Sequence, residues 1–376
     1  MTSRQQPKER VTTKKGDFLT MNENPYGYNN PYGNNQGGYN ALDYVNSQPY
    51  NPYYDSQRFF RRNSDKSNLK KLSLYGGGAL LLYILIQNAI VLGMQLCGLM
   101  DIYYSNDLFQ CAVDIIMSVV GMYLPFVFMG RKMQKISGEA NPTPLNRPIS
   151  GPLTFLAVVA GLGLCMIANY ITSFITIFMS LFGIELSSPE LAMPTGVLGV
   201  ALTVVRIAVV AAIVEEMSLR GFVMGNLRRY GDTFAIIMSS FVFAFMHGNL
   251  IQAPFALIAG FGLGYFSVKT NSLWTGILIH LFNNLISVSV TYLFDVVPEE
   301  TLNTVYGLLV YILIGAGIFA FIIFNKKTRN IPLRKNSTEL STGECVKYYL
   351  LSPTMIAAMI YMLFITITYI STYSAS

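Results

Sequence analysis

Residues 197–224 read VLGVALTVVRIAVVAAIVEEMSLRGFVM, an apolar run that ends in two adjacent glutamates and an arginine. A run of about 20 mainly apolar residues is long enough for a helix to cross a bilayer core about 30 Å thick. Charged side chains inside such a run are costly, so Glu215, Glu216 and Arg220 call for a functional explanation. This stretch therefore predicts a membrane helix that carries a polar site.

The rest of the chain has the composition of a membrane protein. Of its 376 residues, 52% are hydrophobic and 12% are charged, whereas soluble domains have roughly 25% charged residues. A chain this apolar needs lipid around it, so we expect the lipid bilayer to be its environment and expect no nucleic-acid partner.

Successive apolar segments predict an all-α fold, namely a polytopic membrane helix bundle. The predicted spans are 73–98, 108–130, 154–183, 197–224, 234–249, 253–268, 273–294, 302–324 and 349–371. The fifth and sixth are short, and they fit either tilted helices or a hairpin buried within the bundle. We therefore expect nine transmembrane helices, with eight as the alternative.

Four segments are expected along the chain. Residues 1–71 are rich in Asn, Tyr and Pro and have too little aliphatic content to bury a core, so they are predicted to form a disordered cytoplasmic tail. Accessory transmembrane helices are expected over 72–196. The core with the polar site is expected over 197–292, and C-terminal transmembrane helices over 293–376.

The charges of the predicted loops are strongly segregated. Basic loop residues fall on one side of the nine-span arrangement, at Arg131, Lys132, Lys135, Arg147, Arg228, Arg229, Lys269, Lys326, Lys327, Arg329, Arg334, Lys335 and Lys347. Loops on the other side carry Asp101, Asp107, Glu185, Glu190, Asp295, Glu299 and Glu300. Because cytoplasmic loops are enriched in Lys and Arg, this pattern predicts a cytoplasmic N-terminus and an odd number of crossings.

Few ionisable side chains remain inside the predicted spans. Glu216 and Arg220 are four residues apart and share a helix face, whereas Glu215 is turned about 100° away. Glu216 should therefore stay ionised beside Arg220, whereas Glu215, in a drier place, is expected to have a raised pKa suited to proton transfer. The alternative is an ion pair that only holds the bundle together. Arg206 fits either a pair with Asp114 or a contact with a carboxylate of the site.

The only two histidines of the chain lie in two other predicted spans. His280 has Asn284 four residues later, on the same helix face. Measured along their helices from the adjacent basic-side loops, Glu215, His247 and His280 lie about 20, 24 and 16 Å deep. All three fall in the middle band of the bilayer, so their side chains can converge.

The sequence at these positions resembles the CPBP family, which comprises the CAAX proteases and bacteriocin-processing proteins and is also called the Abi family. The motifs that carry the resemblance are Glu215-Glu216-x-x-x-Arg220, Phe243-x-x-x-His247 and His280-x-x-x-Asn284. They occur in the family's order, on successive spans, and the resemblance covers about residues 197–292. Each motif is weak alone, whereas the three together are specific.

The resemblance implies an intramembrane endopeptidase that cuts a membrane-associated peptide or protein, in CAAX-type processing, peptide maturation or bacteriocin self-immunity. It implies water activation by Glu215 and His247, oxyanion stabilisation by His280 and Asn284, and a site shaped by Glu216 and Arg220. We expect a multi-pass protein of a bacterial cell membrane. The sequence leaves the substrate and the oligomeric state open.

A metal-dependent mechanism is the main alternative. Glu215, His247 and His280 are an acceptable set of Zn²⁺ ligands, with water as the fourth ligand. Their spacing differs from the HExxH pattern of zinc protease helices, and metal-independent Glu/His catalysis is favoured.

Two other functions compete with proteolysis. A non-catalytic membrane scaffold or immunity protein of the same fold would not need Glu215, His247, His280 and Asn284 together. A proton-coupled transporter also uses membrane Glu and His residues, but the chain has no internal repeat of the kind found in transporters.

Overall fold

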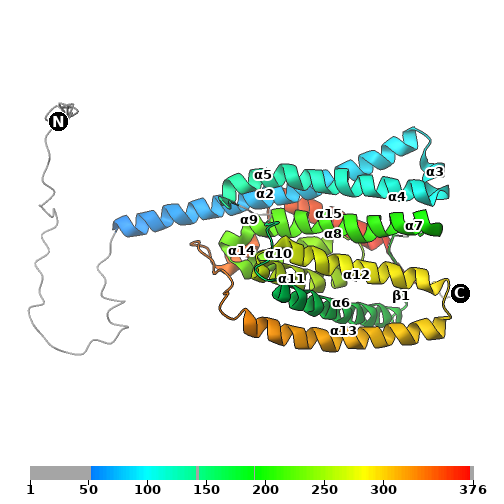
Figure 1. Ribbon diagram of the computed structural model, residues 1–376. Helices are drawn as coiled ribbons and strands as arrows, with labels where there is room; N and C mark the ends of the chain where they lie inside the picture. The colour runs from blue at the N-terminus through cyan, green and yellow to red at the C-terminus, as the bar shows by residue number, and fades with distance from the viewer. Residues whose placement is uncertain (1–51, 141–143, 190, 373–376) are drawn as a thin grey trace, which may run out of the picture. The chain divides into compact units, whose positions relative to one another are not determined.

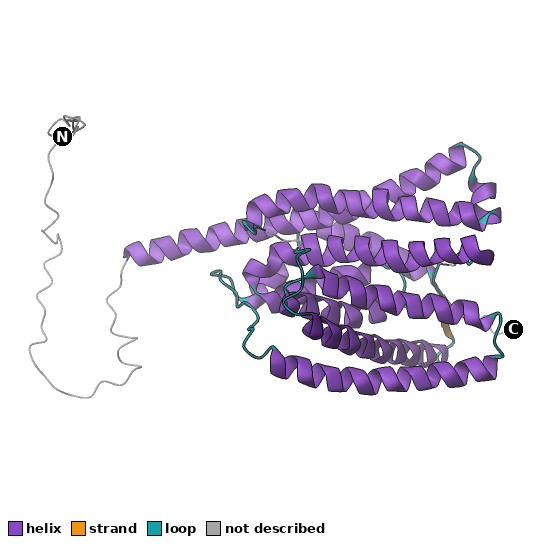
Figure 2. Cartoon of the chain, viewed as in Figure 1, coloured by secondary structure: helices purple, strands orange, loops and turns teal. Residues whose placement is uncertain are grey.

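The chain folds into a bundle of long helices (Figures 1 and 2). This computed structural model describes residues 52–140, 144–189 and 191–372, and Tyr53–Ser376 form one compact unit. Within the described ranges two short strands accompany the helices, β1 (Ile184–Leu186) and β2 (Ile370–Thr372), which pair antiparallel. The predicted all-α fold is confirmed.

The elements before the site are three long helical stretches and a short connecting helix. They are α2 (Pro52–Leu96), α3 (Met100–Ser105), α4 (Asp107–Ile116), the π-helix η1 (Met117–Tyr123), α5 (Leu124–Ser137) and α6 (Gly151–Ser180). The fourth long stretch alternates between helix types. It comprises α7 (Gly196–Thr203), the π-helix η2 (Val204–Val210), α8 (Ala211–Glu215), the π-helix η3 (Glu216–Met224), α9 (Gly225–Leu227) and the 3₁₀ turn η4 (Arg228–Tyr230).

The remaining elements complete the bundle. They are α10 (Asp232–Phe245), α11 (Ala253–Thr270), α12 (Leu273–Phe294), α13 (Glu299–Lys327), α14 (Thr342–Leu350) and α15 (Pro353–Thr368). α14 and α15 are bent by 70° relative to each other.

The number of candidate membrane spans in the described residues is lower than the predicted nine or eight. Six helical stretches in the described residues are long and apolar enough to cross a membrane, or seven if the bent pair α14–α15 is one span. The predicted spans 234–249 and 253–268 account for the difference. α10 has 14 residues and reaches about 21 Å, which is short of a core about 30 Å thick. α10 packs against α11, and the turn between them lies against α15, where a side chain at Gly248 would meet Ile365.

The prediction of a disordered tail is wrong for residues 52–71, which form the first part of α2. Residues 1–51, the rest of that predicted tail, lie outside the described residues. The start of α2 docks on the C-terminal part of the chain, where Arg62 pairs with Glu344 at 2.5 Å, and Leu69 is fully buried. Local composition misses this helix because distant residues stabilise it.

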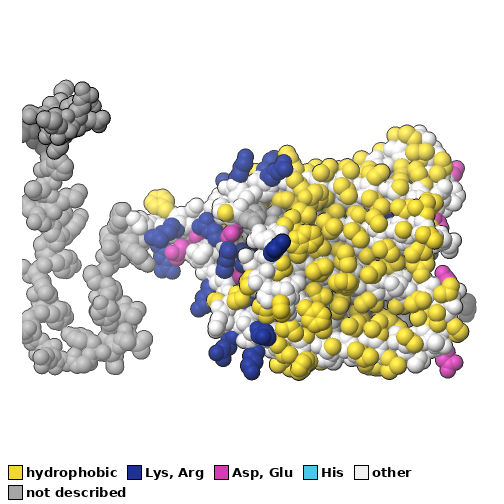
Figure 3. All heavy atoms as spheres, in the orientation of Figure 1, with side chains coloured by type: hydrophobic (Ala, Val, Ile, Leu, Met, Phe, Trp, Pro, Cys, Tyr) yellow, Lys and Arg dark blue, Asp and Glu magenta, His cyan; other side chains and the backbone are white. Residues whose placement is uncertain are grey.

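The two ends of the compact unit differ in charge (Figure 3). Lys and Arg side chains gather at one end, here called the basic end, where α5, α11 and α13 end. Asp and Glu gather at the opposite, acidic end, where α13 begins, and a broad hydrophobic band separates the two. This arrangement agrees with the predicted segregation of loop charges.

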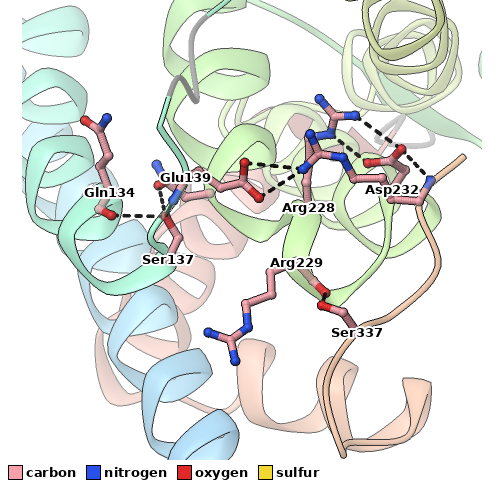
Figure 4. Close-up of polar contacts among 9 residues, drawn as sticks. Gln134, Ser137, Glu139, Arg228, Arg229, Asp232 and Ser337 are labelled. Atoms are coloured by element: carbon pink, nitrogen blue, oxygen red, sulfur yellow. Dashed lines mark hydrogen bonds and ion pairs between the residues drawn. The ribbon is translucent and has the colours of Figure 1, made fainter.

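A polar network fixes the basic end (Figure 4). Arg228 Nε pairs with Asp232 Oδ1 at 2.7 Å, across the turn that leads into α10. Asp232 Oδ2 also accepts a hydrogen bond from the backbone N–H of Arg334 at 2.8 Å, and the Arg334 guanidinium pairs with Glu139 at 3.1 Å. The loop between α13 and α14 is thereby tied to the start of α10, whose far end leads into the turn with His247.

Candidate active site

Glu215 and Glu216 lie at the junction of two helix types. α8 ends at Glu215, and the π-helix η3 begins at Glu216. π-helical turns form i→i+5 hydrogen bonds and often occur at functional sites. The Glu215 side chain is 20% exposed, whereas that of Glu216 is fully buried. The two adjacent carboxylates therefore differ in their surroundings, but the expectation that Glu215 occupies the drier place is wrong, because Glu216 is the buried one.

Glu216 is the centre of a buried charged cluster. Its Oε1 accepts a hydrogen bond from Arg220 Nη1 at 2.9 Å and lies 3.2 Å from His280 Nδ1. The Arg220 side chain is fully buried as well. The predicted pairing of Glu216 with Arg220 is confirmed, and the same carboxylate also orients His280.

His280 lies between the two glutamates. Its Nε2 is 3.7 Å from Glu215 Oε2. This separation is too long for a direct hydrogen bond, but it lets one water molecule bond to both atoms. Glu215 is thus next to His280. Among the described residues, Glu215 and His247 do not approach to ion-pair distance.

His247 follows the end of α10, in the turn before α11. Its Nδ1 is 2.7 Å from the backbone oxygen of Phe243. Because a carbonyl oxygen only accepts, Nδ1 must carry the proton of this bond, and Nε2 of the neutral ring keeps its lone pair. His247 interacts electrostatically with Glu215, His280 and Arg220, so it belongs to the same cluster.

The turn that carries His247 is held by Asn249, a fully buried side chain. Asn249 Nδ2 donates to the His247 carbonyl oxygen at 2.9 Å, and Asn249 Oδ1 accepts from the Gln252 backbone N–H at 2.8 Å. Gly248 has φ +63°, a conformation that suits glycine. Asn249 and Gln252 are not among the residues predicted from the sequence, because the prediction rests on ionisable side chains. Two polar amides within an apolar segment are the sequence feature that could have indicated them.

Phe243 is the aromatic centre of the cluster. Its ring centroid lies 4.2 Å from the guanidinium carbon of Arg220, 4.9 Å from the His247 ring and 6.0 Å from the His280 ring. A guanidinium over an aromatic face is attracted by the ring quadrupole. Phe243 belongs to the second motif but is not among the predicted site residues. It contacts three residues that are, namely Arg220, His247 and His280.

Asn284 faces the fourth helical stretch. Its Nδ2 donates to the backbone oxygen of Ile207 at 2.9 Å, and its Oδ1 accepts from Asn283 Nδ2 at 3.2 Å. Ile207 lies in the π-helix η2, whose hydrogen-bond pattern differs from that of an α-helix. Asn284 therefore hydrogen-bonds to η2, which belongs to the same helical stretch as Glu215 and Glu216.

Arg206 lies outside this cluster. Its Nη1 pairs with Asp114 Oδ2 at 2.6 Å, and its Nη2 donates to the Ala192 backbone oxygen at 2.5 Å. Of the two roles left open by the sequence, the pair with Asp114 is the one formed.

Two glycines make room for the buried charges. A Cβ atom at Gly276 would lie 2.9 Å from Glu216 Oε2 and 2.6 Å from Ser267 Oγ, and a Cβ atom at Gly260 would lie 3.1 Å from Arg220 Nη2. These distances are shorter than normal contacts, so α11 and α12 pack tightly around the Glu216–Arg220 pair.

We expect Gly276→Ala to destabilise the bundle, because the new methyl group displaces the Glu216 carboxylate from its partners. Overpacking of this kind costs about 1–3 kcal/mol. Thermal unfolding in detergent measures the effect, with Gly315→Ala on α13 as the control, since a Cβ atom there meets nothing within 4 Å. Equal unfolding temperatures for the two variants would contradict the tight packing.

In the described residues, the donor side chains of the cluster do not form a metal-binding group. The part of the chain that the structure describes contains no group of three or more His, Cys, Asp or Glu side chains placed to hold a metal ion. Glu215 and His280 approach each other, but His247 does not complete a ligand set with them. Its Nδ1 donates to a backbone carbonyl, so Nε2 is the atom of His247 that could hold a metal ion.

Comparison with known proteins identifies the segment that contains this cluster. Residues 197–286 match the family model described as type II CAAX prenyl endopeptidase Rce1-like. Neither the curated proteins nor the solved structures gave a match. The matched segment runs from α7 into α12 and contains all six predicted site residues. It supports an intramembrane endopeptidase in general, consistent with the CPBP resemblance.

Proposed function

We propose that this chain, whose residues 197–286 carry an Rce1-like CAAX protease domain, hydrolyses a peptide bond of a membrane-associated peptide or protein with Glu215 as the general base. The observation that carries the proposal is the unequal environment of the two glutamates around one imidazole. Glu216 is buried and paired, whereas Glu215 is partly exposed and 3.7 Å from His280 Nε2.

Water activation falls to Glu215. A water molecule between Glu215 Oε2 and the substrate carbonyl carbon would lose its proton to the carboxylate as its oxygen attacks that carbon. A positioned base of this kind contributes roughly 10²–10⁴-fold to the rate. The surrounding apolar helices keep bulk water away and strengthen the electrostatic interactions inside the site.

His247 is assigned to proton transfer together with Glu215. Its Nε2 has the lone pair needed to accept a proton, because Nδ1 donates to the Phe243 carbonyl. After attack, the leaving amine needs a proton. Glu215 has taken a proton from the water, and His247 can pass this proton on to the amine. The transfer requires either a rotation of the His247 ring or a bridging water molecule. Asn249 keeps the backbone of His247 in position for this step.

Stabilisation of the oxyanion is assigned to His280 and Asn284. His280 Nε2 lies beside the place given to the attacking water, so a carbonyl oxygen can bond to it while water on Glu215 attacks the carbon. If both ring nitrogens of His280 donate, the ring is an imidazolium. Its positive charge would balance the single negative charge that remains when Arg220 neutralises one of the two glutamates. One N–H of the Asn284 side-chain amide donates to the Ile207 backbone oxygen, and the second N–H is available to donate to the oxyanion.

Glu216 and Arg220 are assigned to positioning. Both are fully buried and therefore out of reach of a substrate. Arg220 fixes Glu216, and Glu216 in turn fixes the ring of His280 through Nδ1. The basic end of the bundle is proposed to face the cytoplasm, in keeping with the usual excess of Lys and Arg on that side.

A comparison of cells tests the proposed reaction and identifies its substrate. Membrane peptides are quantified by mass spectrometry in cells with the wild-type chain and in cells with Glu215→Ala. We expect at least one membrane-associated protein to lose a defined cleavage product in the variant. Identical peptide sets, with equal amounts of the two chains in the membrane, would contradict the proposal.

The proposed mechanism predicts that chelators leave peptide hydrolysis unchanged. Base, proton carrier and oxyanion donors all come from side chains of the chain itself. Hydrolysis by the purified protein is measured before and after treatment with EDTA or 1,10-phenanthroline, together with the zinc content of the sample. Loss of activity on chelation and recovery with Zn²⁺ would favour the metal-dependent alternative, with Glu215, His247 and His280 as ligands.

A further inference from the structure

A groove opens between α2 and the bend from α14 to α15, outside the segment that matches the protease family. It has a volume of about 410 Å³. Lys70 and Lys71 line it from α2, and Lys347 lines it from α14. All three lysines are exposed.

The lysines of the groove are not neutralised by carboxylates. In the described residues no Asp or Glu forms an ion pair with Lys70, Lys71 or Lys347. Nearby arginines differ in this respect, because Arg58 pairs with Glu339 and Arg62 pairs with Glu344 at the start of α2. The groove therefore presents three positive charges that no carboxylate of the described residues neutralises, and the Lys70 ammonium lies 5.4 Å from the centroid of the Tyr348 ring in the same groove.

The polarity of the groove changes along its length. α2 enters the bundle at the basic end (Figures 1 and 3). α14 runs in the same direction beside it, because Arg62 contacts Glu344 near the start of both helices and Ser73 contacts Tyr349 further along both. On both helices the lysines come first and apolar residues follow, with Leu74 one turn after Lys70, and Leu351 four residues after Lys347. The groove is thus basic at the end where the two helices begin and apolar further along them.

Hydrogen bonds and close packing give the groove a fixed base. Ser73 on α2 hydrogen-bonds to the Tyr349 backbone oxygen, and its hydroxyl lies 2.6 Å from Ser352 Oγ at the bend. One turn further, a Cβ atom at Gly77 would lie 2.4 Å from the Met355 backbone nitrogen, so the two backbones touch. The walls are therefore held at a set separation.

We propose that this groove binds an anionic phospholipid. Lys70, Lys71 and Lys347 hold the phosphate and its headgroup, and one acyl chain lies along Leu74, Leu351 and Pro353. Charge complementarity selects an anionic headgroup over a zwitterionic one. The apolar half of the groove selects a lipid over free phosphate.

The test measures lipid binding directly, so its result does not depend on proteolysis. Full-length protein is delipidated in detergent and titrated with dioctanoyl phosphatidylglycerol, dioctanoyl phosphatidylcholine or inorganic phosphate, and dissociation constants are obtained by native mass spectrometry. The groove variant carries Lys70→Gln, Lys71→Gln and Lys347→Gln. The matched control carries Lys326→Gln, Lys327→Gln and Lys335→Gln, which are also exposed residues of the basic end.

The wild-type protein and the control variant are expected to bind phosphatidylglycerol at least about ten-fold more tightly than phosphatidylcholine, and the groove variant is expected to lose that preference. Equal loss in both variants would overturn the proposal, because it would assign the binding to general surface charge. Inorganic phosphate that binds as tightly as phosphatidylglycerol and displaces it would also overturn the proposal, in favour of a free anion.

Discussion

Glu215→Gln is expected to abolish peptide hydrolysis and leave the protein folded. Glutamine keeps the shape of the side chain but cannot take a proton from water. The rate should fall by roughly 10²–10⁴-fold, the usual contribution of a general base. The fold should survive because Glu215 is partly exposed and the His280 ring, 3.7 Å from it, is also held by Glu216.

Two measurements check this expectation. Hydrolysis of a membrane peptide is followed by mass spectrometry with protein in liposomes, and thermal unfolding is recorded for the same samples. Glu300→Gln is the matched control, since Glu300 is exposed at the acidic end, far from the cluster. A Glu215→Gln variant that keeps more than about a tenth of the wild-type rate would show that another group activates the water.

Glu216→Ala is expected to destabilise the bundle severely. The substitution leaves the Arg220 guanidinium fully buried without its carboxylate partner and removes the acceptor for His280 Nδ1. Breaking a buried ion pair from one side costs about 3–5 kcal/mol. The free energy of unfolding in mixed micelles measures the loss. The exposed pair of Arg58 with Glu339 provides the control, because Glu339→Gln should cost less than about 1 kcal/mol.

A double substitution separates stability from catalysis. Glu216→Leu combined with Arg220→Met replaces both charges by apolar groups of similar size, which is often neutral or stabilising for a buried pair. We expect this variant to regain much of the lost stability and to stay inactive, because His280 has lost the carboxylate that orients it. Full activity in the double variant would show that the pair only holds the helices together.

The parts of the fold that follow from local pattern could be predicted. Long apolar runs gave the main helices, and the spacing of Glu216 and Arg220 gave their contact. The helix over 52–71 could not be foreseen, because it is ordered by contacts with residues more than 270 positions away, such as Arg62 with Glu344. The segment of α10 was expected to be either a tilted span or part of a buried hairpin, because apolar composition alone does not separate the two, and the helix of 14 residues is short for a span.

The sequence predicts which residues form most of the candidate site, but it does not predict how they contact one another. The motifs named six residues, but the ring of His280 bridges both glutamates, and this depends on how α12 packs against η3. π-helices have no clear local sequence signal, so the link from Asn284 to the Ile207 carbonyl in η2 was not foreseen. Phe243 and Asn249 act through contacts that appear only when α10 and the turn after it are in place.

The most direct test of the central claim is cleavage of membrane peptides by the purified protein in liposomes. A panel of membrane-associated peptides is incubated with wild-type protein, Glu215→Ala or His247→Ala, and the products are identified by mass spectrometry. We predict that the wild-type protein cuts at least one peptide at a defined bond and that neither variant does so. Cleavage that survives both substitutions would contradict the assignment of the active site to this cluster.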